Sequence, residues 1–111
     1  MPLIYLWSKF FILTLMVESA ICLPLLGPRH SIARRIAAAT FAQLITHPIA
    51  FFAFPELQLP APEYALLAET WAVAAEFVFY RLMFSDLTSR RALGLSALAN
   101  AASYSVGLLL Q

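Results

Sequence analysis

Charged side chains are scarce in this chain of 111 residues: Asp, Glu, Lys and Arg together make up 12%, whereas about 25% is typical of a soluble domain. Hydrophobic residues make up 62%, against a usual value of about 45–50%. A domain of this length cannot hide that much apolar surface from water, so the composition predicts an integral membrane protein surrounded by lipid. The seven basic residues are spread among short links, which gives no reason to expect a nucleic-acid partner.

Cysteine and histidine are also rare. Cys22 is the only cysteine, which excludes a disulfide framework and a paired-cysteine metal motif. Of the two histidines, His30 lies in a link and His47 in an apolar segment, and no HExxH motif occurs. No motif therefore specifies a metal, and a haem held by two histidines of neighbouring membrane segments is not expected.

Four apolar segments cover about residues 6–26, 35–54, 62–84 and 92–110, and each has close to the 20 residues that a membrane-spanning helix needs. Gly27 and Pro28 should stop the first, and Pro55 the second, which Pro48 should bend. The links between the segments are short, so neighbouring helices should be antiparallel. The sequence predicts an all-α integral membrane protein, an up-down bundle of four transmembrane helices in one domain, residues 1–111.

The link between the second and third segments contains no lysine or arginine, whereas six arginines lie in or beside the other two links: Arg29, Arg34, Arg35, Arg81, Arg90 and Arg91. Basic residues in short loops mark the cytoplasmic side of a membrane protein. We therefore expect these two links to be cytoplasmic and both termini to be on the opposite side, with the plasma (inner) membrane as the location.

The third segment carries Glu69 and Glu76, seven residues or two helical turns apart, so both carboxyl groups share one face. A carboxylate that faces lipid costs roughly 2.5 kcal/mol or more. This face must therefore meet protein, water or an ion.

The other three segments each carry a polar stripe with helical spacing, which predicts a polar layer inside the bundle. The stripes are Thr14, Glu18 and Cys22; then Thr40, Gln43 and His47; and then Ser96, Asn100 and Ser103. Counting about 1.5 Å per residue from the arginines predicts one layer that contains Glu18, His47, Glu69 and Asn100, adjoined by Gln43 and Ser103. The same count puts Glu76 closer to the cytoplasmic end.

A weak internal repeat accompanies these stripes. Residues 34–46 align without gaps on residues 91–103, which pairs Gln43 with Asn100 and Thr46 with Ser103. Glu18 and Glu76 lie at comparable distances upstream. Two such hairpins would form a parallel repeat about an axis along the membrane normal.

Carboxyl, imidazole and amide groups at one depth suit a divalent metal ion such as Zn, Mn or Fe, or a relay of protons. The leading hypothesis is a cation site, for transport or sensing, with Glu18, His47 and Glu69 as ligands or proton carriers. Gln43, Asn100 and Ser103 would orient them, and Glu76 would mark the cytoplasmic exit. Four helices enclose a narrow interior, so a homo-oligomer or a larger membrane complex is expected.

Two alternatives use the same residues. One is an intramembrane metal-dependent hydrolase, in which Glu76 acts as the base; no catalytic residue is specified by motif. The other is a structural or accessory subunit of a membrane complex, in which the polar stripes hydrogen-bond between helices.

In its size, its four segments and its first-helix glutamate, Glu18, the chain resembles the small multidrug exporters. Their motifs in the second to fourth spans have no match here, and three further acidic or histidine groups have no counterpart in them. The resemblance therefore assigns no family.

Overall fold

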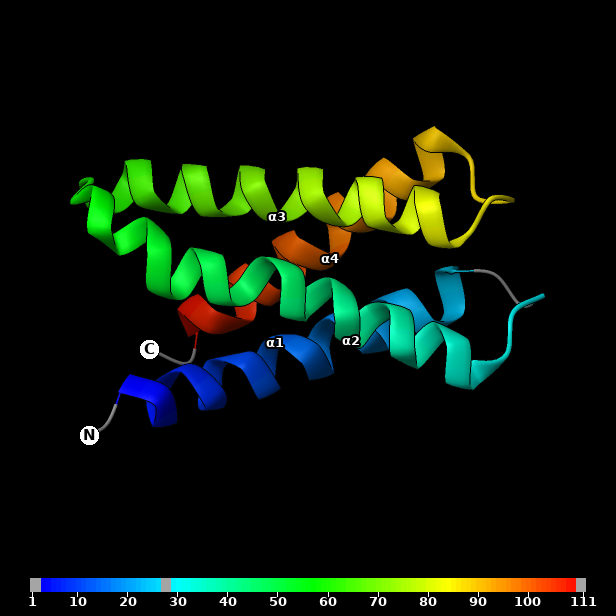
Figure 1. Ribbon diagram of the computed structural model, residues 1–111, viewed down its shortest axis with the longest axis horizontal. Helices are drawn as coiled ribbons and strands as arrows, with labels where there is room; N and C mark the ends of the chain where they lie inside the picture. Colours follow the sequence, from blue (N-terminus) through cyan, green and yellow to red (C-terminus); the bar gives the residue numbers. More distant parts are fainter. Residues whose placement is uncertain (1–2, 27–28, 110–111) are drawn as a thin grey trace.

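The computed structural model describes residues 3–26 and 29–109, and these residues form four α-helices and no strand (Figure 1). The helices are α1 (Leu3–Leu25), α2 (Ile32–Pro48), α3 (Ala61–Met83) and α4 (Ser89–Leu109). The predicted all-α architecture of four helices is confirmed. The predicted stop at residues 27–28 and the predicted end of the fourth segment at residue 110 lie outside the described residues.

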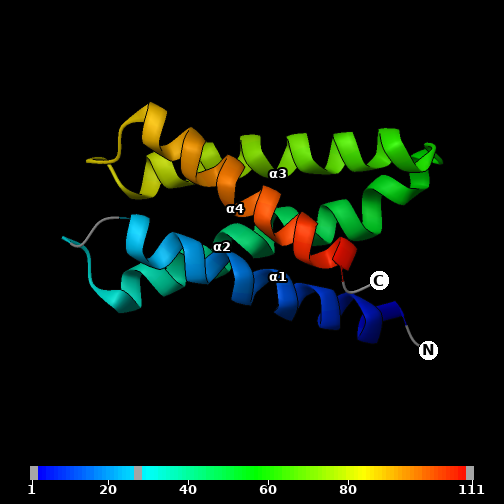
Figure 2. The ribbon, with the colours of Figure 1, turned by 180° about the vertical axis from the view of Figure 1, so that it is seen from behind.

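The helices run alternately up and down, and each packs against two others. α1 lies beside α2 and α4, and α3 also lies beside α2 and α4, so that α1 and α3 occupy opposite corners; Figure 2 shows α4 crossing between α1 and α3. The α1–α2 and α3–α4 links lie together at one end, which we call the arginine end. The α2–α3 link and the ends of α1 and α4 near the termini lie at the other, which we call the terminal end (Figure 1). We call α1 with α2 the first hairpin and α3 with α4 the second.

Pro48 changes the geometry of the second helical segment. The α-helical part ends there, a π-helical turn follows at Ile49–Ala53, and a 3-10 turn at Phe54–Leu57 completes the segment. Proline has no N–H to donate to the carbonyl one turn before it, so the regular α-helical ladder is interrupted. The predicted end at Pro55 falls within this 3-10 turn, because a proline is tolerated in the first turn of a helix, where no N–H is required.

The same kind of cap begins α2 and α4. The Ser31 hydroxyl accepts a hydrogen bond from the Arg34 backbone N–H at 3.1 Å. The Thr88 hydroxyl accepts one from the Arg91 N–H at 3.2 Å. Each cap satisfies a donor that a helix N-terminus leaves unpaired, and the two caps occupy equivalent positions of the repeat that aligns Arg34 with Arg91.

Apolar side chains cover the outside of the bundle, and polar ones lie inside. Met16, Leu66 and Leu82 are 65%, 70% and 79% exposed. The buried polar side chains of the described residues are Glu18, Gln43, Thr46, Glu76, Ser96 and Asn100. This distribution is the reverse of that in a soluble bundle, where charged groups almost never lie fully buried.

Three stretches are long and apolar enough to span a membrane: Ile4–Leu25, Ile32–Leu57 and Ser89–Leu109. α3 has the necessary length, with 23 residues, but it also carries Glu63, Glu69, Glu76 and Arg81. Of the four segments predicted from the sequence, α3 therefore differs from the rest in its charge and not in its length.

Replacement of either cap should destabilise the fold. Ser31→Ala and Thr88→Ala each leave a helix N-terminal N–H unpaired, and we expect each to lower the free energy of unfolding by about 1 kcal/mol. Reversible denaturation in detergent, followed by circular dichroism, measures this change. Ser89→Ala, which keeps both caps, is the control, and an equal loss in that variant would contradict the assignment.

Candidate functional site

Two carboxyl groups from opposite corners of the bundle meet in its interior. Glu18 of α1 is 1% exposed and Glu76 of α3 is 0% exposed. Their carboxyl groups are direct neighbours, with the Gln43 amide of α2 beside Glu18 and the Asn100 amide of α4 beside Glu76. We call these four side chains, together with Thr46 and Ser103, the carboxyl layer.

Two hydroxyl groups connect the hairpins through these carboxyls. The Thr46 hydroxyl of the first hairpin lies 3.4 Å from Oε2 of Glu76, and the Ser103 hydroxyl of the second lies 3.5 Å from Oε2 of Glu18. Each hydroxyl also lies near a carbonyl of its own helix, at 3.0 Å from that of Ala42 and at 3.2 Å from that of Asn100. A hydroxyl has one hydrogen, so each donates either to its own helix or to the carboxyl of the opposite hairpin.

Three buried atoms of the layer have no hydrogen-bond partner among the described residues: Oε1 of Glu18, Oε1 of Glu76 and Nε2 of Gln43. Leaving one buried polar group unpaired costs about 1–3 kcal/mol. A cation or a shared proton beside the two carboxyl oxygens would satisfy both of them.

A cavity of about 460 Å³ lies next to the layer, on the side of the terminal end. Its lining includes five members of the carboxyl layer, Glu18, Gln43, Thr46, Asn100 and Ser103, but not Glu76. The remaining wall is built mostly from small and aromatic side chains, such as Ala65, Ala68, Phe10, Phe51 and Tyr64. A volume of this size is within the range of sites for small ligands, about 300–1,000 Å³.

His47 and Glu69 line the same cavity. His47 lies among aromatic rings, with its ring centroid 5.7 Å from that of Phe11 and 6.3 Å from those of Trp7 and Phe51. Its buried Nδ1 has no hydrogen-bond partner in the described part of the chain. Within residues 3–26 and 29–109, no three His, Cys, Asp or Glu side chains are grouped so that they could hold a metal ion. The predicted set of Glu18, His47 and Glu69 therefore shares a cavity without forming such a group.

The sequence predicts Glu76 closer to the cytoplasmic end than Glu18, but the two are neighbours. Glu76 lies in the half of α3 (Ala61–Met83) nearer the arginine end, and Glu18 lies in the corresponding half of α1 (Leu3–Leu25), so both are displaced from the middle of the bundle toward that end. Arg81 lies within α3, and its guanidinium reaches past the helix end to donate to the carbonyl of Leu87. Long basic side chains commonly extend in this way, so an arginine is a poor marker of the depth of its own backbone.

Thr46 was not among the predicted site residues, although it is 3% exposed and contacts Glu76. The signal that could have identified it is the internal repeat, which pairs it with Ser103. Ser96 is likewise fully buried, and its hydroxyl donates to the carbonyl of Val73 at 2.9 Å.

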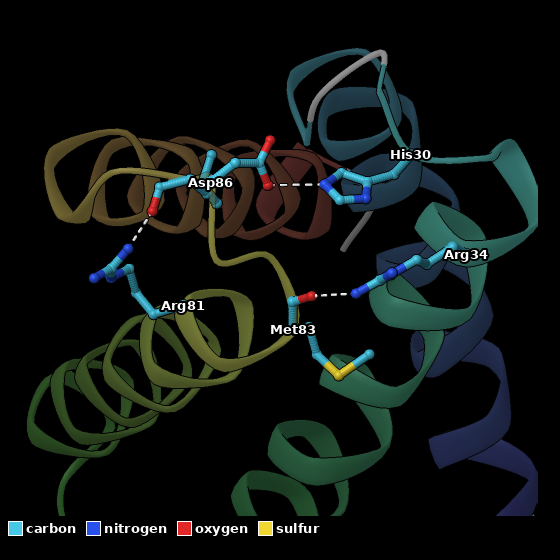
Figure 3. Close-up of polar contacts among 6 residues, drawn as sticks. His30, Arg34, Arg81, Met83 and Asp86 are labelled. Carbon is cyan, nitrogen blue, oxygen red and sulfur yellow. Dashed lines mark hydrogen bonds and ion pairs between the residues drawn. The ribbon is translucent and has the colours of Figure 1, made fainter.

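The bundle is closed on the arginine side of the layer. The sulfur of Cys22 lies 3.6 Å from the hydroxyl of Tyr80, and both side chains are fully buried, as are Leu26 and Phe84. Contacts between the two hairpins follow at the end itself (Figure 3). His30 Nε2 lies 2.8 Å from Oδ1 of Asp86, and the Arg34 guanidinium donates to the Met83 carbonyl at 2.6 Å.

No protein-family model, curated protein or solved structure matches the chain. The chemistry of the site must therefore indicate its function. Carboxyl, amide and hydroxyl oxygens are the groups that bind protons and hard cations. No lysine or arginine is among the described side chains that line the cavity.

The His30–Asp86 contact should make stability depend on pH. The hydrogen bond from His30 holds the pKa of the Asp86 carboxyl below its usual value. A lowered pKa in the folded state stabilises the fold above the unfolded value of about 3.9, and this contribution is lost as the pH falls through the folded pKa. We expect Asp86→Asn to be less stable than the native chain at pH 6, with a smaller difference between them at pH 3, as judged by denaturation in detergent. A difference that is the same at both pH values would count against the contact.

The hydroxyls of the carboxyl layer should contribute to stability in equal measure. Thr46→Val and Ser103→Ala each remove a donor from a buried carboxyl group, and we expect each to lower the free energy of unfolding by about 1 kcal/mol. Thr40→Val and Ser105→Ala are matched controls, because these hydroxyls donate only to carbonyls of their own helices, those of Ile36 and Ala101. If the control variants lose as much free energy of unfolding as the test variants, the contacts with the carboxyl groups contribute nothing to stability.

Proposed function

We propose that this protein crosses a membrane with all four helices. Three stretches have the required length and composition, large apolar side chains cover the outside, and the longest dimension of 41 Å exceeds a hydrocarbon core of about 30 Å. α3 can also cross, because Glu76 is buried, Glu69 faces the cavity and Arg81 extends toward the arginine end. The remaining charge, Glu63, lies in the first turn of the helix.

The orientation follows from the arginines. Both arginine-rich links lie at one end of the bundle, and basic short loops remain in the cytoplasm. We place the arginine end in the cytoplasm of a plasma membrane and the termini outside, so that the cavity lies toward the outer surface.

Within this architecture, the carboxyl layer binds a cation for transport or sensing. The observation that carries the proposal is the burial of two adjacent carboxyl groups, Glu18 and Glu76, each with one unpartnered oxygen and with no described lysine or arginine beside them. Two like charges cannot both remain ionised in an apolar interior without a compensating positive charge. A proton or a metal ion supplies it.

The ligands differ from those that the sequence favoured. Glu18 and Glu76 provide the charge, and oxygen atoms of Gln43 and Asn100 complete the surroundings. His47 and Glu69 line the cavity through which a cation reaches the layer from the terminal end. A divalent ion held there would have mainly oxygen ligands, which favours Mg²⁺, Ca²⁺ or Mn²⁺ over softer metals.

The proposal predicts that neutralising either carboxyl group disables the site. Glu18→Gln and Glu76→Gln should each reduce cation binding at least tenfold, because half of the negative charge is removed. Calorimetric titration with divalent ions, elemental analysis of the purified protein, and proton flux in vesicles with an enclosed pH-sensitive dye test both kinds of cation. Glu63→Gln, which removes an exposed carboxyl from the same helix, is the matched control.

The proposal is wrong, and the carboxyl layer is only structural, if two results are found together. The native chain retains no metal, and its proton binding and proton flux equal those of both variants.

A further inference from the structure

The two hairpins repeat one set of contacts. The caps formed by Ser31 and Thr88 are equivalent. Equivalent backbone hydrogen bonds also lie at the ends of α1 and α3. The Leu26 N–H donates to the Cys22 carbonyl at 2.8 Å, and the Phe84 N–H donates to the Tyr80 carbonyl at 2.9 Å. Most importantly, each hydroxyl contacts the carboxyl group of the opposite hairpin: Thr46 contacts Glu76, and its counterpart Ser103 contacts Glu18.

These reciprocal contacts indicate that a two-fold axis relates the two hairpins. Residues near a two-fold axis meet their own equivalents across it. Cys22 meets Tyr80, each being four residues beyond a buried glutamate, and Glu18 meets Glu76. The axis therefore runs along the bundle and passes between the two carboxyl groups.

We propose that Glu18 and Glu76 hold one proton between them on this axis, as a single shared site and not as two separate carriers. This inference rests on the proposed cation site and names its ligand. One carboxyl group is neutral and donates its proton to the carboxylate of the other, and each glutamate has one oxygen for which the described protein offers no partner. Removing the proton would leave two adjacent carboxylates, which repel each other. Adding a second proton would neutralise the carboxylate that accepts the hydrogen bond.

Among the described residues, no lysine or arginine lines the cavity beside the pair. α1 contributes the Cys22 thiol, α3 contributes Glu69 and the Tyr80 hydroxyl, and α4 contributes only the neutral Asn100 and Ser103 near the pair. From α2, His47 lines the adjoining cavity. Since Glu69 brings further negative charge, the groups around the pair favour retention of the shared proton.

The two hydroxyls allow the proton to be on either side. An ionised carboxylate is a stronger acceptor than a backbone carbonyl. When Glu18 carries the proton, Ser103 is free to donate to the Asn100 carbonyl while Thr46 donates to the ionised Glu76. When Glu76 carries it, Thr46 returns to the Ala42 carbonyl and Ser103 donates to Glu18. The two states exchange the roles of equivalent residues, so their energies should be similar.

Infrared titration of the carboxyl groups tests the inference. The carbonyl stretch of protonated carboxyl groups is followed as the native protein is titrated in lipid nanodiscs. The Glu18–Glu76 pair should take up two protons in two well-separated steps. Glu18→Gln and Glu76→Gln should each leave one step, and the two remaining steps should have similar midpoints, because the two positions are equivalent. The double variant should lose both steps, and Glu63→Gln should keep both.

Conservative variants guard against loss of folding. Glu18→Asp and Glu76→Asp retain both carboxyl groups and should retain two steps, with helical content checked by circular dichroism. If the glutamine variants do not fold, the inference is tested by the native chain and the two aspartate variants, each of which should show two protonation steps.

The ways in which the inference and the proposed function can fail are distinct. A single two-proton step, or a stoichiometric metal ion with no protonated carboxyl at neutral pH, overturns the shared proton but leaves the cation site in place. Unequal midpoints for the two glutamine variants overturn the equivalence of the carboxyl groups. No change in proton uptake or metal content in either variant overturns the cation site itself.

Discussion

The burial of two carboxyl groups against each other is the constraint on which the rest of the bundle depends. Glu18 and Glu76 come from helices at opposite corners, so they can be neighbours only if α2 and α4 leave the centre to them. Small side chains make this possible: Ala38, Ala42 and Ala99 are buried where bulkier residues would separate the helices. The large apolar residues are then left to cover the outside, which is the arrangement that a lipid environment requires.

Access to the layer differs between its two sides, and the difference has a local cause. On the arginine side, Cys22, Tyr80, Leu26 and Phe84 fill the interior. On the other side, the π-helical turn after Pro48 displaces the regular path of the segment, and Thr46, His47, Ala50 and Phe51 from this region line the cavity. Donors from α3 stabilise the irregular backbone: Tyr64 donates to the Ala50 carbonyl at 2.6 Å, and Trp71 donates to the Thr46 carbonyl at 3.2 Å. Neighbouring helices commonly satisfy backbone groups where an α-helical ladder is interrupted, and such turns are frequent at functional sites.

The sequence was informative about faces and less informative about depth. The spacing of polar residues correctly placed Glu18, Gln43 and Asn100 inside, because a helix has a fixed period and a polar residue facing lipid is costly. Counting residues from the arginines separated Glu18 and Glu76 in depth, whereas both lie in the halves of α1 and α3 nearer the arginine end and are neighbours. Thr46 was overlooked because a threonine in a helix can donate to its own backbone, and only its partner across the bundle reveals a second role.

The energies involved argue against a purely structural role for the carboxyl layer. Hydrogen bonds between membrane helices contribute about 0.6 kcal/mol each on average, and the two contacts between hairpins through Thr46 and Ser103 are long, at 3.4 and 3.5 Å. In the proposed membrane location, burying one carboxylate costs roughly 2.5 kcal/mol or more, and a second carboxyl group lies beside it. Asparagine or glutamine at both positions would join the hairpins as well at a smaller cost. Two acids side by side therefore support the proposal that the layer takes up and releases a positive charge, which amides cannot do.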